Sequence, residues 1–150
     1  MLINVNLPSK NYDVVLERGL LNHIKDFYDF GESKVLVITD EGVPSFYSEL
    51  LLKQIKNGHL LVLKQGEESK SFENFMLIQK ELISLDFTRH DYIVSLGGGV
   101  IGDLSAFVSS TYKRGIKFVN IPTTSLSQID SSVGGKTAIN FIFVHFLIFR

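Results

Sequence analysis

The stretch "SLGGGVIGDLSAF", residues 95–107, decides the fold of this 150-residue chain. It continues the apolar run 91–96, which is typical of a buried strand, and it leads into residues 101–112, whose pattern predicts a helix. Its glycines match the pattern G-x-G-x-x-G at Gly97, Gly99 and Gly102. Glycine lets the backbone approach a ligand closely, and a helix N-terminus attracts an anion. The pattern indicates a phosphate site; the alternative is a tight strand-to-helix turn that needs positive φ.

Working outward, similar apolar runs predict further buried strands at 34–39 and 59–64, and a fourth strand is predicted at 117–122. One helix is expected to open at Pro44 and to stop at Asn57-Gly58, and a second is expected to be capped by Ser71. The first helix should bury Tyr47, Leu50, Leu51 and Ile55. The second should bury Phe72, Phe75, Met76, Leu82 and Ile83. Strands that alternate with helices predict a parallel sheet with right-handed crossovers.

Residues 3–19, "INVNLPSKNYDVVLERG", precede this alternation and read as two short strands broken at Pro8. The predicted fold class is therefore α/β: a Rossmann-like parallel sheet with flanking helices, preceded by a short β-hairpin. Ligands of such sheets bind at the carboxyl ends of the strands. The unusual residues of the chain follow these ends, namely Asp40, the turn "QGEESK" (65–70), the glycines and "PTTS" (122–125).

Composition excludes several other classes of protein. The net charge of −1 offers no basic surface for nucleic acid, and the absence of cysteine excludes disulfides and thiolate zinc sites. The N-terminus lacks the pattern of a signal peptide, and residues 141–149 are fewer than the about 20 that a membrane span needs. We expect a cytoplasmic protein without a membrane partner.

Two features separate the chain from common nucleotide-binding proteins. A Rossmann loop is followed after about 20 residues by an acidic residue that holds the ribose. No Asp or Glu occurs from Leu104 to Ile129, so Asp40 is the expected substitute. The second motif, "GGKT" (134–137), is not a Walker A loop, because Asp130 stands where the motif needs glycine. Lys136 can still be presented to an anion, although a solvated surface lysine is the simpler interpretation.

Residues 97–140, "GGGVIGDLSAFVSSTYKRGIKFVNIPTTSLSQIDSSVGGKTAIN", closely resemble the 3-dehydroquinate synthase family. Weaker similarity extends back through "QGEESKS" and "VLVITDEGV" (35–43). Other sugar-phosphate cyclases and the iron-dependent alcohol and glycerol dehydrogenases share this fold. The "PTT…DSSVGGKT" block favours the cyclases.

The resemblance implies NAD as cofactor and assigns roles to matching positions. The turn of Gln65, Gly66, Glu67, Glu68, Ser69 and Lys70 would bind NAD. The loop of Gly98, Gly99, Val100, Ile101, Gly102 and Asp103 would bind its diphosphate. Thr123, Thr124 and Lys136 would also contact NAD, and Asp40 would meet the adenosine ribose. Catalytic roles would fall to Asp130, Lys136 and Arg114, the last reaching the substrate phosphate of a neighbouring subunit.

Simpler interpretations of some of these residues remain open. Asp103 could cap the third helix, "PTTS" could be a turn plus an N-cap, and Lys113-Arg114 could be a solvated helix end. No histidine has metal-ligand spacing with another, so His23, His59 and His90 are interpreted as structural or solvated.

The family reaction converts 3-deoxy-D-arabino-heptulosonate 7-phosphate to 3-dehydroquinate and phosphate in the shikimate pathway, with NAD used catalytically. A divalent metal, zinc or cobalt, polarises the hydroxyl that is oxidised. The resemblance implies a small sugar-phosphate substrate, and a homodimer for the full-length enzyme. The alternatives are a portion of an iron-dependent dehydrogenase and a non-catalytic NAD-binding relic.

The resemblance stops at Asn140, where the family continues with His-Pro, a glycine and Lys-Asn. The chain instead reads "FIFVHFLIFR" (141–150). We expect residues 1–140 to form the NAD-binding domain, 141–150 to be an aberrant apolar tail, and the helical domain with the metal ligands to be absent. A broken reading frame or a naturally diverged short protein would explain this. The chain alone is expected to be inactive and poorly soluble.

Overall fold

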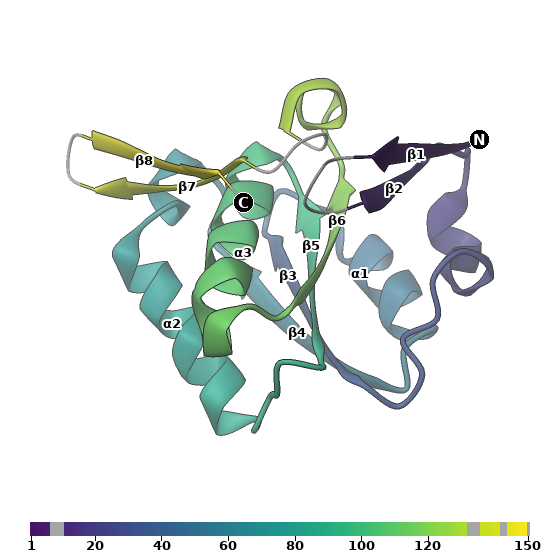
Figure 1. Cartoon of the computed structure of the whole chain (residues 1–150), viewed down its shortest axis with the longest axis horizontal. Coiled ribbons are helices and arrows are strands. Elements are labelled where there is room, and N and C mark those ends of the chain that lie inside the picture. Colours follow the sequence, from purple (N-terminus) through teal and green to yellow (C-terminus); the bar gives the residue numbers. More distant parts are fainter. Residues whose placement is uncertain (7–10, 132–135, 142–143, 150) are drawn as a thin grey trace.

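The computed structural model describes residues 1–6, 11–131, 136–141 and 144–149. Its centre is a parallel sheet of four strands in the order β4-β3-β5-β6. These strands are β3 (Lys34–Asp40), β4 (Asn57–Leu63), β5 (Tyr92–Gly97) and β6 (Lys117–Pro122). The predicted α/β class with a Rossmann-like parallel sheet is confirmed (Figure 1).

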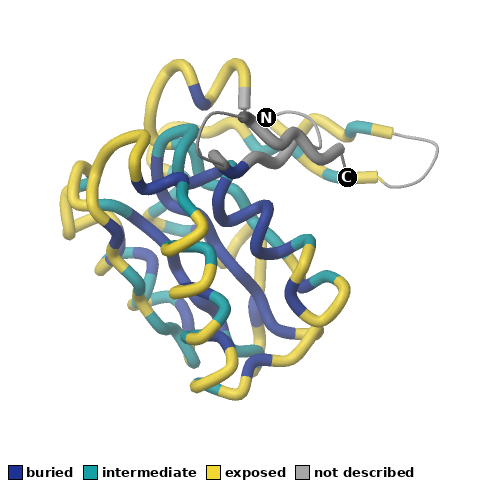
Figure 2. The backbone as a smooth tube through the Cα atoms, turned by 90° about the vertical axis from the view of Figure 1, so that its left-hand side faces the viewer, coloured by how far each residue is buried: buried dark blue, intermediate teal, exposed yellow. Residues whose placement is uncertain are grey.

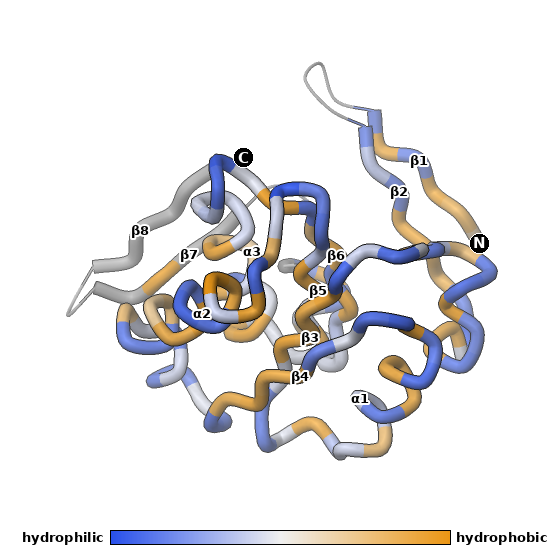
Figure 3. Tube along the Cα trace, turned by 90° about the horizontal axis from the view of Figure 1, so that it is seen from below, coloured by the Kyte–Doolittle hydropathy of each residue, from blue (hydrophilic) through white to orange (hydrophobic). Residues whose placement is uncertain are grey.

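Helices cover both faces of this sheet. The main helices are α1 (Ser45–Leu52), α2 (Phe72–Ser84) and α3 (Gly99–Thr111). Successive side chains of β3 point to opposite faces of the sheet. Leu36 and Ile38 pack in the apolar cluster formed with α2 and α3. Val35 and Val37 pack in the other cluster, with Leu51 of α1. Burial is therefore almost continuous along β3 and β5. Figure 2 shows buried backbone in the interior of the molecule, and Figure 3 shows that apolar residues predominate along these two strands.

Shorter elements complete the chain. They are the 3-10 helices η1 (Leu20–Asp26), η2 (Glu67–Ser69) and η3 (Tyr112–Arg114), and the π-helical turn η4 (Ser127–Ser131). The expected N-terminal hairpin is present as β1 (Leu2–Asn6) and β2 (Asn11–Val15). A second hairpin pairs β7 (Lys136–Phe141) with β8 (Val144–Phe149), and Ile139 of β7 is buried in the cluster with α3. No described helix is long and apolar enough to cross a membrane.

Two expectations, one about a helix boundary and one about the burial of a strand, are wrong. Helix α1 ends at Leu52 instead of Asn57-Gly58, because Asn57 and Gly58 already pair with the start of β3. Strand β4 is not buried on both faces: it lies at the edge of the sheet, where Leu60 and Val62 are 40% and 50% exposed.

The inward faces of two helices also differ from the expectation. In α1, Leu51 is fully buried, but Tyr47 is 44% exposed. In α2 the fully buried residues are Ile78 and Leu82, whereas the predicted Phe72, Met76 and Ile83 are exposed. Only one narrow side of α2 meets the core, so part of its apolar surface faces solvent.

Candidate cofactor site

The carboxyl edge of the sheet gathers most of the predicted site. The parallel register sets Asp40 of β3 beside Leu63 of β4, and Gly97 of β5 beside Pro122 of β6. Each strand end therefore delivers its following loop to the same edge (Figure 1). These loops are the turn at Asp40, the turn 65–70, the three glycines 97–99 (the glycine loop) and residues 123–124.

No described side chain caps the N-terminus of α3, which follows the glycine loop. Gly98 is the N-cap, with φ −74° and ψ −171°, and no acidic residue stands in the first turn. Helix α2 differs, since its cap Ser71 accepts a hydrogen bond from the Asn74 amide. The Gly102 amide bonds the Gly98 carbonyl, so the amides before it, in the first turn, have no partner within the helix. Such a terminus favours an anion.

Steric contact, and not positive φ, explains two of these glycines. None of Gly97, Gly98, Gly99 and Gly102 has positive φ, so the expectation of a turn that needs it is wrong. A Cβ on Gly97 would lie 2.8 Å from Cβ of Ile101, and one on Gly98 would lie 3.3 Å from Cγ2 of Thr124. A side chain at Gly97 would therefore clash with Ile101, and one at Gly98 would be crowded by Thr124.

A salt bridge ties the turn 65–70 to α3. Lys70 Nζ lies 2.7 Å from Asp103 Oδ2, and the two side chains are 9% and 22% exposed. Asp103 lies inside α3, so the interpretation of Asp103 as a helix cap is wrong. Glu67 lies 4.0 Å from the same Lys70 Nζ. The structure thus brings three of the predicted NAD contacts together.

The backbone of that turn is also specialised. Gly66 has φ 119°, a conformation that favours glycine, and open space surrounds the position of a Cβ. Ser69 Oγ donates to the Lys64 carbonyl at 2.5 Å, and its own carbonyl accepts from Asn74 of α2. Ser69 is therefore a buried structural residue, whereas Gln65 and Glu68 are exposed at the edge.

Asp40 is half-buried at the end of β3 and lies beside the same turn. Its Oδ1 accepts a hydrogen bond from the Gly42 amide at 2.8 Å. A Cβ on Gly42 would come within 2.6 Å of Gln65 Nε2 and 3.0 Å of Asp40 Oδ1. The carboxylate and the carboxamide therefore lie against the same glycine, at the edge where a ribose is expected.

The residues after β6 have distinct surroundings. Thr123 is exposed, and its amide donates to the Gly97 carbonyl at 2.9 Å. Thr124 bonds Ser127 through both its hydroxyl and its amide, so the "PTTS" segment forms the turn and cap that the simpler interpretation describes. Ser127 is a residue that sequence reasoning missed, because its hydroxyl stands where the usual capping box, Ser/Thr-x-x-Glu/Gln, has Glu or Gln.

Two further residues that the sequence did not indicate, Ser95 and Asn120, form a hydrogen bond beneath the glycine loop. Ser95 Oγ donates to Asn120 Oδ1 at 2.5 Å across β5 and β6. A Cβ on Gly102 would lie 3.5 Å from that same Asn120 oxygen, so this carboxamide faces the first turns of α3. No motif signals the pair, because it depends on strand register.

The predicted catalytic residues are not all gathered. Asp130 is exposed in η4, at the carboxyl edge. For Lys136 only the backbone, the first residue of β7, is described, and Gly134-Gly135 lie outside the described residues. Arg114 follows the C-terminus of α3, so the length of that helix places it about 20 Å from the glycine loop.

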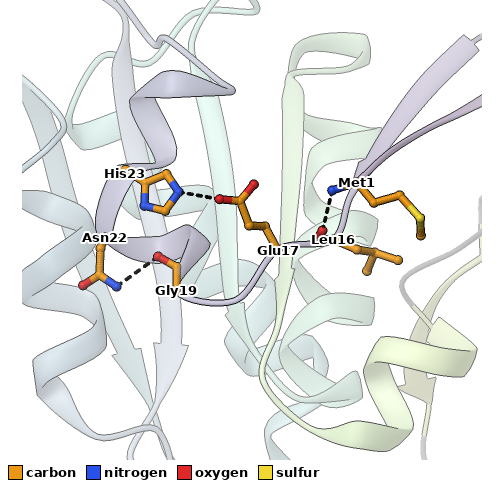
Figure 4. Close-up of polar contacts among 6 residues, drawn as sticks. All are labelled: Met1, Leu16, Glu17, Gly19, Asn22 and His23. Atoms are coloured by element: carbon orange, nitrogen blue, oxygen red, sulfur yellow. Dashed lines mark hydrogen bonds and ion pairs between the residues drawn. The ribbon is translucent and has the colours of Figure 1, made fainter.

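Among the described residues, no three His, Asp or Glu side chains approach closely enough to hold a metal ion. His23 Nε2 lies 3.0 Å from Glu17 Oε1 (Figure 4), and the ring of His59 packs edge-on against Phe87. These contacts agree with the structural interpretation of both histidines. The part of the chain that the structure describes therefore does not fit a divalent metal site.

Comparison with known proteins identifies relatives. The sequence profile "3-dehydroquinate synthase N-terminal" matches residues 60–148. The 3-dehydroquinate synthase of Clostridium botulinum is 42% identical over 142 residues, covering 91% of this chain and 41% of that protein. The enzyme of the same name from Caulobacter vibrioides is 44% identical, covering 92% and 39%. The chain thus spans about two fifths of the length of these relatives.

Solved structures that resemble this chain include two synthases with bound NAD+. A 2-deoxy-scyllo-inosose synthase complexed with carbaglucose-6-phosphate, NAD+ and Co2+ has a TM-score of 0.86 at 25% identity, covering 99% of this chain and 43% of that one. ValA, a 2-epi-5-epi-valiolone synthase from Streptomyces hygroscopicus with NAD+ and Zn2+ bound, has a TM-score of 0.77 at 29% identity, covering 91% and 39%. A probable glycerol dehydrogenase from Sinorhizobium meliloti, at 18% identity, shares the fold alone.

The matched range extends past Asn140 to residue 148, into the segment expected to be foreign to the family. The domain boundary at residue 140 stays a prediction. The family profile covers more than half of the chain and agrees with the named relatives. The chain belongs to the 3-dehydroquinate synthase family.

Proposed function

We propose that this chain forms the NAD-binding part of a 3-dehydroquinate synthase. The observation that carries the proposal is the N-terminus of α3, which no described side chain caps and which lies in a run of three consecutive glycines, at the carboxyl edge of the sheet. Family membership supports it, as do the NAD+ complexes of related sugar-phosphate cyclases.

The residues present fit a dinucleotide in this position. The first-turn amides of α3 would donate hydrogen bonds to the diphosphate, whose negative charge suits the partial positive charge of the helix N-terminus. Asp40 would accept hydrogen bonds from the adenosine ribose hydroxyls. Lys70 would place one cation near the diphosphate while its partner Asp103 keeps it oriented.

Bound NAD would supply hydride acceptance and return, so that the ring is oxidised and restored without net redox change. The chain would hold the cofactor and keep water away from its diphosphate. Asp130 and Lys136 would face the substrate, 3-deoxy-D-arabino-heptulosonate 7-phosphate, and Arg114 would serve the site of a neighbouring subunit. A cation is the expected partner of a substrate phosphate. Because the described residues do not fit a metal, no step is assigned to one.

Isothermal titration calorimetry of NAD+ into the purified chain tests the proposal. Val100 lies in the first turn of α3, so Val100→Glu would place a carboxylate where the diphosphate should bind. Val100→Gln is the matched control, with nearly the same shape and no charge. We expect NAD+ to bind the wild type, and the Glu variant to bind at least about tenfold more weakly than the Gln variant.

Thermal unfolding separates binding from folding, because an acidic residue in the first turn stabilises a helix by about 0.3–1 kcal/mol. The Glu variant should therefore unfold no lower in temperature than the Gln variant. Absence of NAD+ binding by the wild type, or equal affinity of both variants, would contradict the proposal.

A further inference from the structure

The loop after β6 contains four hydrogen bonds that join Thr124 to Ser127. Thr124 Oγ1 lies 2.8 Å from Ser127 Oγ, and the Ser127 amide donates to Thr124 Oγ1 at 3.2 Å. In return, the Thr124 amide donates to Ser127 Oγ at 3.2 Å, and Ser127 Oγ donates to the Thr124 carbonyl at 2.9 Å. Ser127 is only 3% exposed. We call these four bonds the Thr124–Ser127 box.

The box uses the hydroxyl proton of Thr124. A hydroxyl has one proton to donate and two lone pairs to accept with. Ser127 Oγ gives its proton to the Thr124 carbonyl, so it must accept the proton of Thr124 Oγ1. While the box is closed, Thr124 has no proton left for a phosphate oxygen, which is a pure acceptor. Thr123 is exposed, and its hydroxyl has no partner among the described residues.

The box also fixes the floor of the glycine loop. It orients Thr124 so that Cγ2 lies 3.3 Å from where a Cβ on Gly98 would stand. Next to it, the Thr123 amide holds the Gly97 carbonyl. The methyl group of Thr124 and the backbone of Thr123 therefore support the two residues that precede α3.

We propose that Ser127 is a positioning residue of the cofactor site. It holds Thr124 as a clamp against Gly98, and this leaves Thr123 as the hydroxyl that donates to the diphosphate of the dinucleotide. The proposal rests on the proposed NAD site and divides the roles of two threonines that the sequence treats as one pair.

A double-mutant cycle on NAD+ affinity, measured by calorimetry, tests this division. The variants are Thr123→Val, Thr124→Val, Ser127→Ala and their pairwise combinations; valine keeps the shape of threonine and removes the hydroxyl. Thr123→Val should weaken NAD+ binding about tenfold without lowering the unfolding temperature. Ser127→Ala and Thr124→Val should each weaken binding a few-fold, and the pair no more than the stronger single change. Ser127→Ala combined with Thr123→Val should multiply the two effects.

Adenosine is the second probe, because it carries no diphosphate. Its affinity, measured by ligand-observed NMR, should be unchanged in Ser127→Ala, whereas a general loss of structure would weaken adenosine and NAD+ alike. Gln79→Ala, on α2 at the far end of α3, is the control for both ligands.

The outcomes are distinguishable. If the wild type fails to bind NAD+, the proposed function falls and takes this inference with it. If the wild type binds but Ser127→Ala and Thr124→Val act independently, or Thr124→Val weakens binding more than Thr123→Val, only the clamp is overturned. Equal loss of adenosine and NAD+ affinity in Ser127→Ala would also overturn it.

Discussion

Lys70 shows how a single residue can join segments distant in the sequence. Its salt bridge to Asp103 is shielded from solvent, so removal of the cation would leave a partly buried carboxylate without its partner. The sequence predicted both residues to lie at the carboxyl edge of the sheet, but only the structure shows that their side chains form a salt bridge. Their pairing depends on how η2 packs on α3, which no local pattern encodes.

Lys70→Met should lower the free energy of unfolding by about 2 kcal/mol, measured by urea denaturation. Lys56→Met is the matched control, because Lys56 and Glu32 are also 2.7 Å apart but 65% and 78% exposed. That exposed pair should contribute no more than about 0.5 kcal/mol. Equal losses in both variants would show that shielding does not strengthen the Lys70 pair.

Asp91 should make stability depend on pH. Desolvation raises the pKa of its carboxyl, but hydrogen bonds from the Thr88 and Lys34 amides and the Thr88 hydroxyl outweigh this and lower it overall. The folded-state pKa of Asp91 therefore lies below the unfolded value of about 3.9. The stabilisation from this carboxylate is complete above about pH 4 and is lost as the pH falls through the folded-state pKa. Stability of the wild type should decline in this acid range.

Asp91→Asn should therefore be less stable than the wild type at pH 7, and the difference should shrink below about pH 4. Urea denaturation at several pH values measures it, with the exposed Asp26→Asn as control. A constant difference from pH 7 to pH 2 would contradict the assignment.

At the scale of elements, the junction of β5 and α3 gives the sharpest contrast between glycines. Gly97→Ala would bring a Cβ to 2.8 Å from Ile101 Cβ, an atom held by the helix, so overpacking should cost about 1–3 kcal/mol. Gly102→Ala would meet Asn120 at an ordinary 3.5 Å. Because Gly102 is inside the helix, alanine should be neutral or stabilise by up to about 1 kcal/mol. Urea denaturation measures both; a greater loss for Gly102→Ala would contradict the steric account.

Sequence predicted the elements well where burial is continuous and poorly where it is partial. The apolar runs of β3 and β5 were sufficient to predict buried strands, because central strands of a parallel sheet are buried on both faces. The run of β4 looks similar, but edge position depends on strand order, which periodicity does not contain. The same limit applies to α2, whose apolar residues exceed what its contact with α3 can bury.

For the site, sequence placed the strand-end loops at one edge, since topology alone dictates this. It could not divide roles within a loop: the Thr124–Ser127 box and the Lys70–Asp103 pair both depend on side-chain geometry. The role implied for Arg114 requires a second chain, because the length of α3 separates it from the glycine loop.

For the whole molecule, the exposed apolar surface of α2 should govern behaviour in solution. Phe72, Met76 and Leu77 are 40–48% exposed and lie together around one hollow. Exposed apolar patches drive association. Sedimentation velocity should show concentration-dependent self-association that Met76→Lys/Leu77→Gln reduces. The control Phe46→Ser, on α1, should not; equal reduction by the control would rule out α2 as the responsible surface.

The measurement that tests the account most directly maps the amide shifts of the ¹⁵N-labelled chain during an NAD+ titration. The account predicts saturable shifts at Gly98–Gly102, with further shifts at Lys70 and Thr123, and little change at Gly115 and Lys117 on the opposite edge. Shifts that gather at Gly115, or on α2, with the glycine loop unmoved, would contradict the claim that the N-terminus of α3 is the cofactor site.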